Sequence, residues 1–208
     1  FSKNSWRTII AACQNKQVPD TWNVGDSCMM AFGKKNYQID IIGKNHDDYA
    51  DGSGKAPLTF QMHTTYATQY KMNGAEDNSC GWKNCLVRTS NAFPALKKVM
   101  PAEVVAALKA VTKKTTAGGA SSAIDTTEDT LFLLSEIEVQ GTRTHSYAGE
   151  GTQYAYYQTA ANRKKNRAWY LRSPRISSTS CFCRTGWSGE ADWSVASEVD
   201  GIAAAWCF

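Results

Sequence analysis

Both ends of this 208-residue sequence consist of residues that belong in a protein core, and this limits how the chain can be divided. Near the start, SWRTIIAACQNKQ places apolar residues at helical spacing, which predicts a helix over residues 5–16, ended by Pro19. The closing GIAAAWCF is typical of a short buried strand. No repeat of roughly 20 to 50 residues is visible. We therefore predict one domain over residues 1–208, and because it begins with Phe1, we expect it to be the C-terminal part of a longer protein.

The segments between these ends predict a mixture of helices and strands, an α+β fold. YQIDIIG, with glycine-containing turns before it, is the clearest strand. Residues 85–114 have the apolar spacing of helix, with Pro101 at a helix start and lysines in the last turn. TTAGGASSAIDTTED predicts a polar loop or hairpin arm, and DTLFLLSEIEV a hydrophobic strand. The polar, tyrosine-rich residues 142–168 predict a long excursion across the surface.

Charge and hydropathy argue against membrane insertion and against nucleic-acid binding. No run of about 18 apolar residues is present, so nothing is expected to insert in a membrane. The net charge is +4, and the basic residues are spread over two regions rather than one stripe with aromatic residues between them. Solvated helix and loop faces explain this pattern better. The two regions contain Lys97, Lys98, Lys109, Lys113 and Lys114, and Arg163, Lys164, Lys165 and Arg167.

The sequence contains no recognisable catalytic constellation. His46, His63 and His145 lie in unrelated polar segments, and the nucleophile elbow, phosphate-binding loops and zinc-protease motif are missing. Two acidic pairs, Asp47 with Asp48 and Glu136 with Glu138, have ordinary neighbours, and structural hydrogen bonds are their expected role. We therefore predict that the chain is not an enzyme.

The seven cysteines predict mostly reduced, buried thiols rather than disulfides or a metal site. Their number is odd, and no spacing matches a zinc knuckle. One alternative is redox chemistry or Cu(I) binding by Cys181, Cys183 and Cys207. Another is calcium binding by the acidic loop at residues 45–55, although its carboxylates do not follow EF-hand spacing. We predict no metal site and no cofactor.

The segment from Arg175 to Asp200 has a composition unlike the rest of the chain. It is made of Ser, Thr, Gly, Trp, Arg, Cys and acidic residues, with no helical period and little alternation. Trp187 and Trp193 lie among small polar residues, which favours partial exposure over burial beneath a loop. Rigid aromatic side chains provide contact area at low entropy cost, while Ser and Gly adapt to a partner. This composition predicts a long binding loop.

Several phrases of the sequence resemble an uncharacterised domain family found in phage virion proteins and in surface proteins of Gram-positive gut bacteria. In order, they are NHDDYADGSGKAPLTFQMH, YKMNG, GWKNCLVR, DTLFLLSEIEV, GTQYAYY, WYLRSP and GIAAAWCF. The family is similar to the formylglycine-generating-enzyme branch of the C-type-lectin fold. The resemblance implies a small, twisted, mostly antiparallel sheet, two main helices, long loops, and contact between the first and last segments.

The same fold carries the variable proteins of diversity-generating retroelements, whose rewritten C-terminal residues line a ligand-binding face. The resemblance assigns this position to residues 175–200. It implies a scaffold made of Trp169, Leu171, Arg172, Ser173, Gly201 and the last strand. The candidate contact residues are Arg175, Ser177, Ser178, Ser180, Arg184, Thr185, Trp187, Glu190, Asp192 and Trp193.

The resemblance implies receptor recognition or adhesion by a virion or bacterial surface protein. The expected partner is a protein or glycan of a host or cell surface, and a homo-oligomer such as a trimer, or contact with other virion proteins, is compatible with this role. The chain departs from the family at Ala204, where proline is usual, and it lacks the motifs of calcium-dependent sugar binding. Two alternatives are a structural decoration domain of a virion and a copper-dependent oxidase relative.

Overall fold

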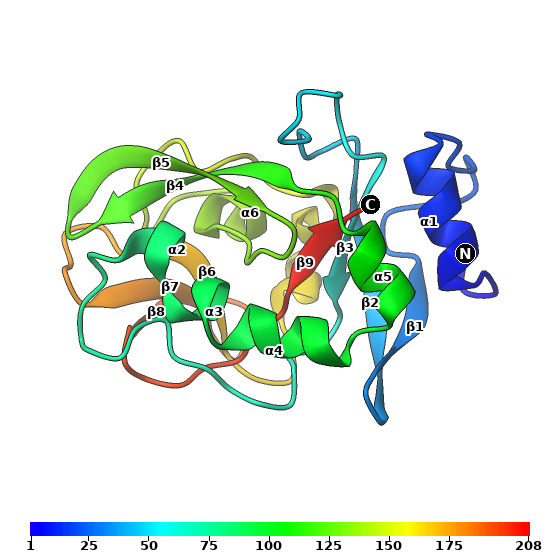
Figure 1. Ribbon diagram of the computed structural model, residues 1–208. Coiled ribbons are helices and arrows are strands. Elements are labelled where there is room, and N and C mark those ends of the chain that lie inside the picture. The colour runs from blue at the N-terminus through cyan, green and yellow to red at the C-terminus, as the bar shows by residue number, and fades with distance from the viewer.

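The computed structural model describes residues 1–208 as an α+β structure with three small antiparallel sheets (Figure 1). The largest sheet has the order β1-β2-β3-β9 and comprises Ser27–Phe32, Lys35–Lys44, Leu58–Met62 and Ala205–Cys207. A hairpin forms the second, from β4 (Val111–Gly118) and β5 (Ser121–Asp129). The third has the order β6-β7-β8, with Trp169–Pro174, Cys181–Thr185 and Ala191–Val195. The predicted α+β class with antiparallel sheets is confirmed.

The first helix and the last strand meet, as expected. Helix α1 (Trp6–Gln14) begins where the Ser5 hydroxyl accepts a hydrogen bond from the backbone N–H of Thr8 at 3.2 Å. The indole of Trp6 packs edge-on against the ring of Phe208 with centroids 6.2 Å apart. The hydroxyl of Tyr49 donates to the Phe208 carbonyl at 2.5 Å, so the end of the chain is held inside the core.

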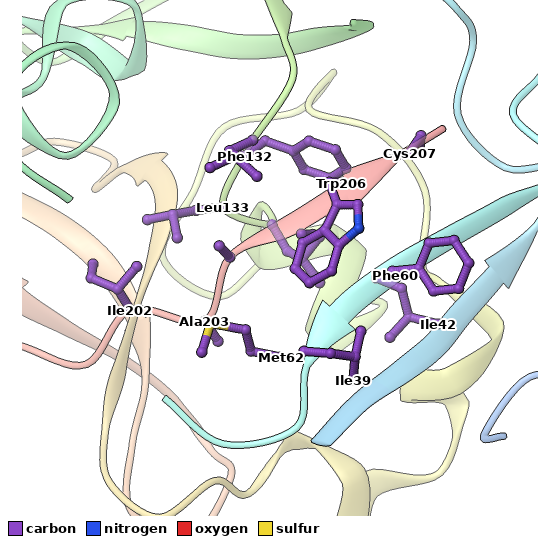
Figure 2. Close-up of a cluster of buried hydrophobic side chains, with 14 of the residues drawn as sticks. Ile39, Ile42, Phe60, Met62, Phe132, Leu133, Ile202, Ala203, Trp206 and Cys207 are labelled. Carbon is purple, nitrogen blue, oxygen red and sulfur yellow. The ribbon is translucent and has the colours of Figure 1, made fainter. Parts of the chain in front are cut away.

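Strand β9 is buried because it lies between β3 and the segment around Phe132. It pairs with β3 on one side, and Phe132 and Ala205 exchange two backbone hydrogen bonds of 2.9 Å on the other. Figure 2 shows Trp206 of β9 above Phe60 of β3, whose ring centroids are 6.4 Å apart, with Ile39 and Ile42 of β2 below them. The predicted terminal strand is therefore a central part of the core.

The predicted helix over residues 85–114 is wrong as a single element. The described helices here are short: α2 (Gly81–Asn84), α3 (Leu86–Thr89), α4 (Ala92–Val99) and α5 (Ala102–Ala107). Pro101 disfavours helical geometry in the residue before it, and Met100 is extended with φ −69° and ψ 153°, which ends α4. Residues 111–114 belong to strand β4, where Val111 and Lys113 are buried and Lys114 is exposed.

The predicted hydrophobic strand DTLFLLSEIEV is mostly irregular backbone that leads into helix α6 (Glu136–Gln140). The hydroxyl of Ser135 accepts from the backbone N–H of Glu138, whose carboxylate accepts from the N–H of Ser135 in return. This reciprocal capping box starts a helix within an otherwise strand-like apolar run. Gly141, with a positive φ of 74°, ends it.

Residues 142–168 do not simply cross the surface. They contain two short 3₁₀ helices, η1 (Ala155–Gln158) and η2 (Ala160–Arg163), and Tyr154 and Tyr157 are fully buried. The tyrosine-rich composition therefore reflects packing against the core rather than a path across the surface.

The expected long loop over residues 175–200 is instead a β-hairpin. Strands β7 and β8 pair in regular register from Cys181 with Val195 to Thr185 with Ala191. The sequence signal was weak because β7 is buried at almost every position, which hides the alternation of a half-exposed strand. In Figure 1 this sheet lies at the opposite end of the molecule from α1.

All seven cysteines are free thiols, six of them buried and Cys80 partly so. The predicted burial of the thiols is confirmed. None of the helices combines the length and the apolar character needed to cross a membrane.

Candidate functional site

The turn between β7 and β8 exposes a tryptophan to solvent. The side chain of Trp187 is 66% exposed, although the turn that carries it is tightly closed. The backbone N–H of Gly186 donates to the Glu190 carbonyl at 2.9 Å, and that of Gly189 donates to the Gly186 carbonyl at 3.2 Å. The backbone that carries Trp187 is therefore held in place.

Side-chain hydrogen bonds also stabilise this turn. One carboxylate oxygen of Glu190 accepts from the backbone N–H of Ser188 at 2.9 Å and from its hydroxyl at 2.5 Å. These hydrogen bonds lower the pKa of Glu190, so the carboxylate stays ionised and keeps both bonds at neutral pH. A Cβ on Gly186 would lie 2.0 Å from the other carboxylate oxygen, so an alanine there would displace the Glu190 carboxylate. Glu190, predicted as a contact residue, serves here to build the turn.

Trp193 of β8 is the second exposed tryptophan of the hairpin, with 38% of its surface accessible. The guanidinium of Arg175 lies over its ring, 4.1 Å from the centroid. A cation–π contact of this kind leaves the N–H groups at the edge of the guanidinium free for a partner. The structure thus brings together two of the predicted contact residues, and the predicted partial exposure of both tryptophans is confirmed.

Two other predicted contact residues on this sheet pair with each other. The guanidinium of Arg184 donates to Asp192 at 2.7 Å and to Asp200 at 2.9 Å. Burial raises the pKa of Asp200, and the pairing with Arg184 offsets part of that effect. Arg184 and Asp192 are consequently held in place, and most of their charge is already compensated within the chain.

The remaining predicted contact residues lie before β7 or at its end. Ser177 has a positive φ of 54°, and the Ser178 carbonyl accepts from the Asn78 amide at 3.0 Å. Ser180 donates its backbone N–H to the Ser178 hydroxyl at 3.2 Å. Thr185 is fully buried, and its hydroxyl has no hydrogen-bond partner. We therefore remove Thr185 from the contact set, because its side chain points into the protein rather than to a ligand.

A polar cleft of about 460 Å³ is the second feature that could serve as a site. None of its lining residues is hydrophobic. At its floor, the buried ammonium of Lys113 forms ion pairs with Asp47 and, at 3.2 Å, with Glu138, and donates to the Tyr154 hydroxyl at 2.9 Å. Burial alone would raise the pKa of Asp47, but attraction to Lys113 and hydrogen bonds outweigh it and lower the pKa to about 2.

Arg172 of β6 completes the floor of the cleft. It forms a bidentate pair with Glu138 and also donates to the Thr115 hydroxyl at 2.9 Å and to the carbonyls of Leu133 and Glu150 at 3.0 and 2.8 Å. These bonds use the five N–H groups of the guanidinium, just as those of Lys113 use its three. The charged floor therefore joins β4, β6 and α6 and leaves no buried donor for a ligand.

Part of this ion network could be predicted from the sequence. The resemblance placed Arg172 in the scaffold, and the structural role expected for Glu138 agrees with its pairing. Lys113 was assigned to a solvated face and is buried, because the segment is a strand that turns it inward. The β-branched residues of VTKKTT indicate a strand, but nothing in this stretch of sequence shows which of its two lysines faces inward.

The alternative metal sites do not form around the expected residues. In the acidic loop, Asp47, Asp48 and Asp51 face three different lysines instead of one another. No group of three or more His, Cys, Asp or Glu side chains is arranged to hold a metal ion. Cys183 is buried, which raises the pKa of its thiol, and Cys207 contacts Thr59 and Asp47 from the core. Inert thiols of this kind favour packing over redox chemistry.

A family model described as "Domain of unknown function (DUF6273)" matches residues 58–207, from β3 to β9. This range includes the β7–β8 hairpin with both exposed tryptophans, as well as Lys113, Glu138 and Arg172 of the ion network. No match was found among curated proteins or among solved structures.

Proposed function

The chain belongs to the DUF6273 family, and we propose that it is a binding domain that recognises its ligand through the β7–β8 hairpin. The observation that carries this proposal is Trp187, which is 66% exposed on a turn closed by both backbone and side chains. Exposed tryptophans on rigid backbone are typical anchors of binding surfaces, because little entropy is lost when a partner covers them.

The neighbouring side chains support the same role. Three of the five exposed large hydrophobic side chains, Trp187, Trp193 and Val199, lie on or just after the hairpin. Strand β6 of the same sheet carries Arg172, whose bidentate pair with Glu138 anchors the sheet to the core. A rigid base with exposed residues at one end allows the contact residues to change without unfolding the core.

We further propose a C-type-lectin-like arrangement and a role in receptor recognition or adhesion by a phage virion or bacterial surface protein. The resemblance of WYLRSP and GIAAAWCF motivates this, together with the contact between the chain ends. Diversification by a retroelement predicts that sibling genes differ mainly at codons 175–200. Uniform sequences over these codons would contradict it.

A binding experiment with three variants tests the proposal. Trp187→Ala and Trp193→Ala are compared with Ile124→Ala, a control on β5 of a different sheet whose side chain is 40% exposed. Labelled protein is applied to intact Gram-positive gut bacteria and to a glycan array. We expect the tryptophan variants to lose about tenfold or more in affinity and the control to bind as the wild type does. Equal binding by all four proteins would refute the hairpin as the binding surface.

A virion decoration domain is the second candidate, since a neighbouring subunit would also cover an exposed tryptophan. It predicts self-association that Trp187→Ala weakens, which sedimentation velocity would detect. A monomer over the whole concentration range would remove this candidate.

A further inference from the structure

The outer edges of the sheets differ in how well they are covered. On the edge strand β1, the carbonyl of Met29 accepts a hydrogen bond from the Trp6 indole at 2.8 Å, so α1 protects it. Strand β9 is bridged by Phe132 and by Lys109. Strand β8 is the outer strand of the β6-β7-β8 sheet, and its central residues have no such cover. An open strand edge is a template for another strand.

The register shows which groups of β8 are open. Hydrogen bonds from Gly186 N–H to the Glu190 carbonyl and from Ala196 N–H to the Ser180 carbonyl mark bonded pairs at the two ends of the ladder. Bonded and non-bonded pairs alternate in an antiparallel ladder. Ala191 and Trp193 therefore each belong to a non-bonded pair with β7, and the N–H and C=O groups of these two residues point away from β7.

Val195 is the next residue of β8 whose backbone groups point away from β7, and the open part of the edge ends there. The Val195 carbonyl accepts from the Tyr170 hydroxyl at 2.7 Å and from the Glu198 N–H at 3.0 Å. The open part of the edge therefore extends from Ala191 to the N–H of Val195. At roughly 3.4 Å per residue, this length matches about five residues of an added strand.

We infer that this edge of β8 takes an extended, acidic peptide segment of a protein partner, which adds to the sheet as a fourth strand. The inference rests on the proposed function and names the class of ligand at the same hairpin. The partner's main chain would pair with Ala191 and Trp193, and its side chains would alternate between the two faces of the sheet.

Charge decides the acidic character of the segment. The guanidinium of Arg175 over the Trp193 ring has no acidic partner within the chain. Asp192 of the hairpin is paired with Arg184, and Glu190 keeps its charge but accepts its hydrogen bonds from Ser188 within its own turn. Arg175 beside Trp193 is therefore a cation without a counter-charge, and an Asp or Glu of the added strand on that face would pair with it.

A peptide fits these features better than a glycan does. A sugar ring could stack on Trp187 or Trp193, but it would leave the row of backbone donors and acceptors unused. An extended peptide satisfies the row and the cation together. Glycan binding is accordingly an outcome of the test rather than part of the proposal.

The test starts from a displayed library of 12-residue peptides selected on the wild-type domain. We expect selected peptides to carry Asp or Glu at alternate positions. Their affinity is measured by fluorescence anisotropy for Ala191→Pro, which removes one edge N–H, and for the matched control Ala191→Ser, which keeps it. We expect binding about fivefold to tenfold weaker for the proline variant and within about twofold for the control. Arg175→Gln should weaken binding and reduce its dependence on salt.

Amide exchange by NMR gives an answer even where the proline variant fails to fold. In the free wild-type domain, the amides of Ala191 and Trp193 should exchange rapidly and become protected when a selected peptide is added. Unchanged exchange, or wild-type affinity of a folded Ala191→Pro, overturns the inference. So does a selection that yields no peptide while bacteria or glycans bind in a Trp187-dependent way, and the proposed function then stands. Loss of the proposed function itself is recognised separately, by Trp187→Ala and Trp193→Ala binding as the wild type does.

Discussion

At the scale of single residues, Arg172 is the side chain on which the buried charge balance most depends. It neutralises Glu138 in the core, and Lys113 alone would have to serve both Glu138 and Asp47 without it. We expect Arg172→Met to lower the free energy of unfolding by about 3 to 5 kcal/mol, because a buried carboxylate loses its bidentate partner. Urea denaturation followed by tryptophan fluorescence measures this.

Arg175→Met is the matched control for this prediction. It removes the same charge from a partly exposed site without an ion pair, so its effect should stay within about 1 kcal/mol. Equal effects of the two substitutions would mean that the ion network adds nothing beyond ordinary surface charge.

The exposure or burial of some residues could be predicted from the sequence, and that of others could not. The exposure of Trp187 and Trp193 could be predicted, because small polar neighbours cannot bury a large ring. The burial of Lys113 and of Thr185 could not, because it depends on how segments distant in the sequence pack together; for Lys113 these segments carry its partners Asp47 and Glu138. A charged residue is expected to be exposed unless a group of opposite charge is known to lie next to it.

At the scale of elements, the β7–β8 turn links local geometry to binding. Gly186→Ala would place a methyl group 2.0 Å from a carboxylate oxygen of Glu190 and displace it from Ser188. We expect the variant to keep Trp187 but to bind a hairpin ligand about threefold to tenfold more weakly, because the tryptophan is no longer fixed before binding.

The measurement for this prediction is affinity together with thermal stability. Glu190→Gln is a useful companion, since it keeps the size of the side chain and weakens the bonds from Ser188. Both variants should melt close to the wild type, as the turn is at the surface. Full affinity in Gly186→Ala would show that the closed turn is irrelevant to binding.

The elements that sequence reasoning placed correctly are those with local signals. Ser5 and the apolar spacing after it define α1, and YQIDIIG defines much of β2. The segment over residues 85–114 was predicted wrongly because its apolar residues fit helical spacing, while Pro101 and the β-branched residues from Val111 onward divide it. The hairpin over residues 175–200 was missed because a strand buried on both faces has no alternation to detect.

At the scale of the whole molecule, the chain ends are joined through the core. Trp6 near the start and Trp206 and Phe208 at the end pack on Phe60, which lies in the middle of the largest sheet. The apolar ends of the sequence predicted that both belong to one core, but the position of β9 between β3 and Phe132 followed only from the structure. Long-range pairing of this kind has no local sequence signal.

The stability of the whole molecule should depend on pH through two buried groups in separate windows. The pKa of Asp47 is lowered to about 2, below its value of about 3.9 in an unfolded chain. Between these values the unfolded chain binds more protons, so the stabilisation by Asp47 is complete above about pH 4 and is lost as the pH falls toward 2. The wild type should therefore lose its stability advantage over Asp47→Asn in this acidic range.

Lys165 should make the free energy of unfolding depend on pH in an alkaline range, where stability again rises as the pH rises. Burial lowers the pKa of its ammonium to about 7, whereas an unfolded lysine has a pKa of about 10.4. Between these values the unfolded chain again holds more protons, so the free energy of unfolding rises with pH. Lys165→Met leaves the carbonyls of Met62 and His63 without their donor, but that loss is independent of pH. Urea midpoints from pH 7 to pH 10 should rise for the wild type relative to the variant, and parallel profiles would show that Lys165 keeps an ordinary pKa in the folded protein.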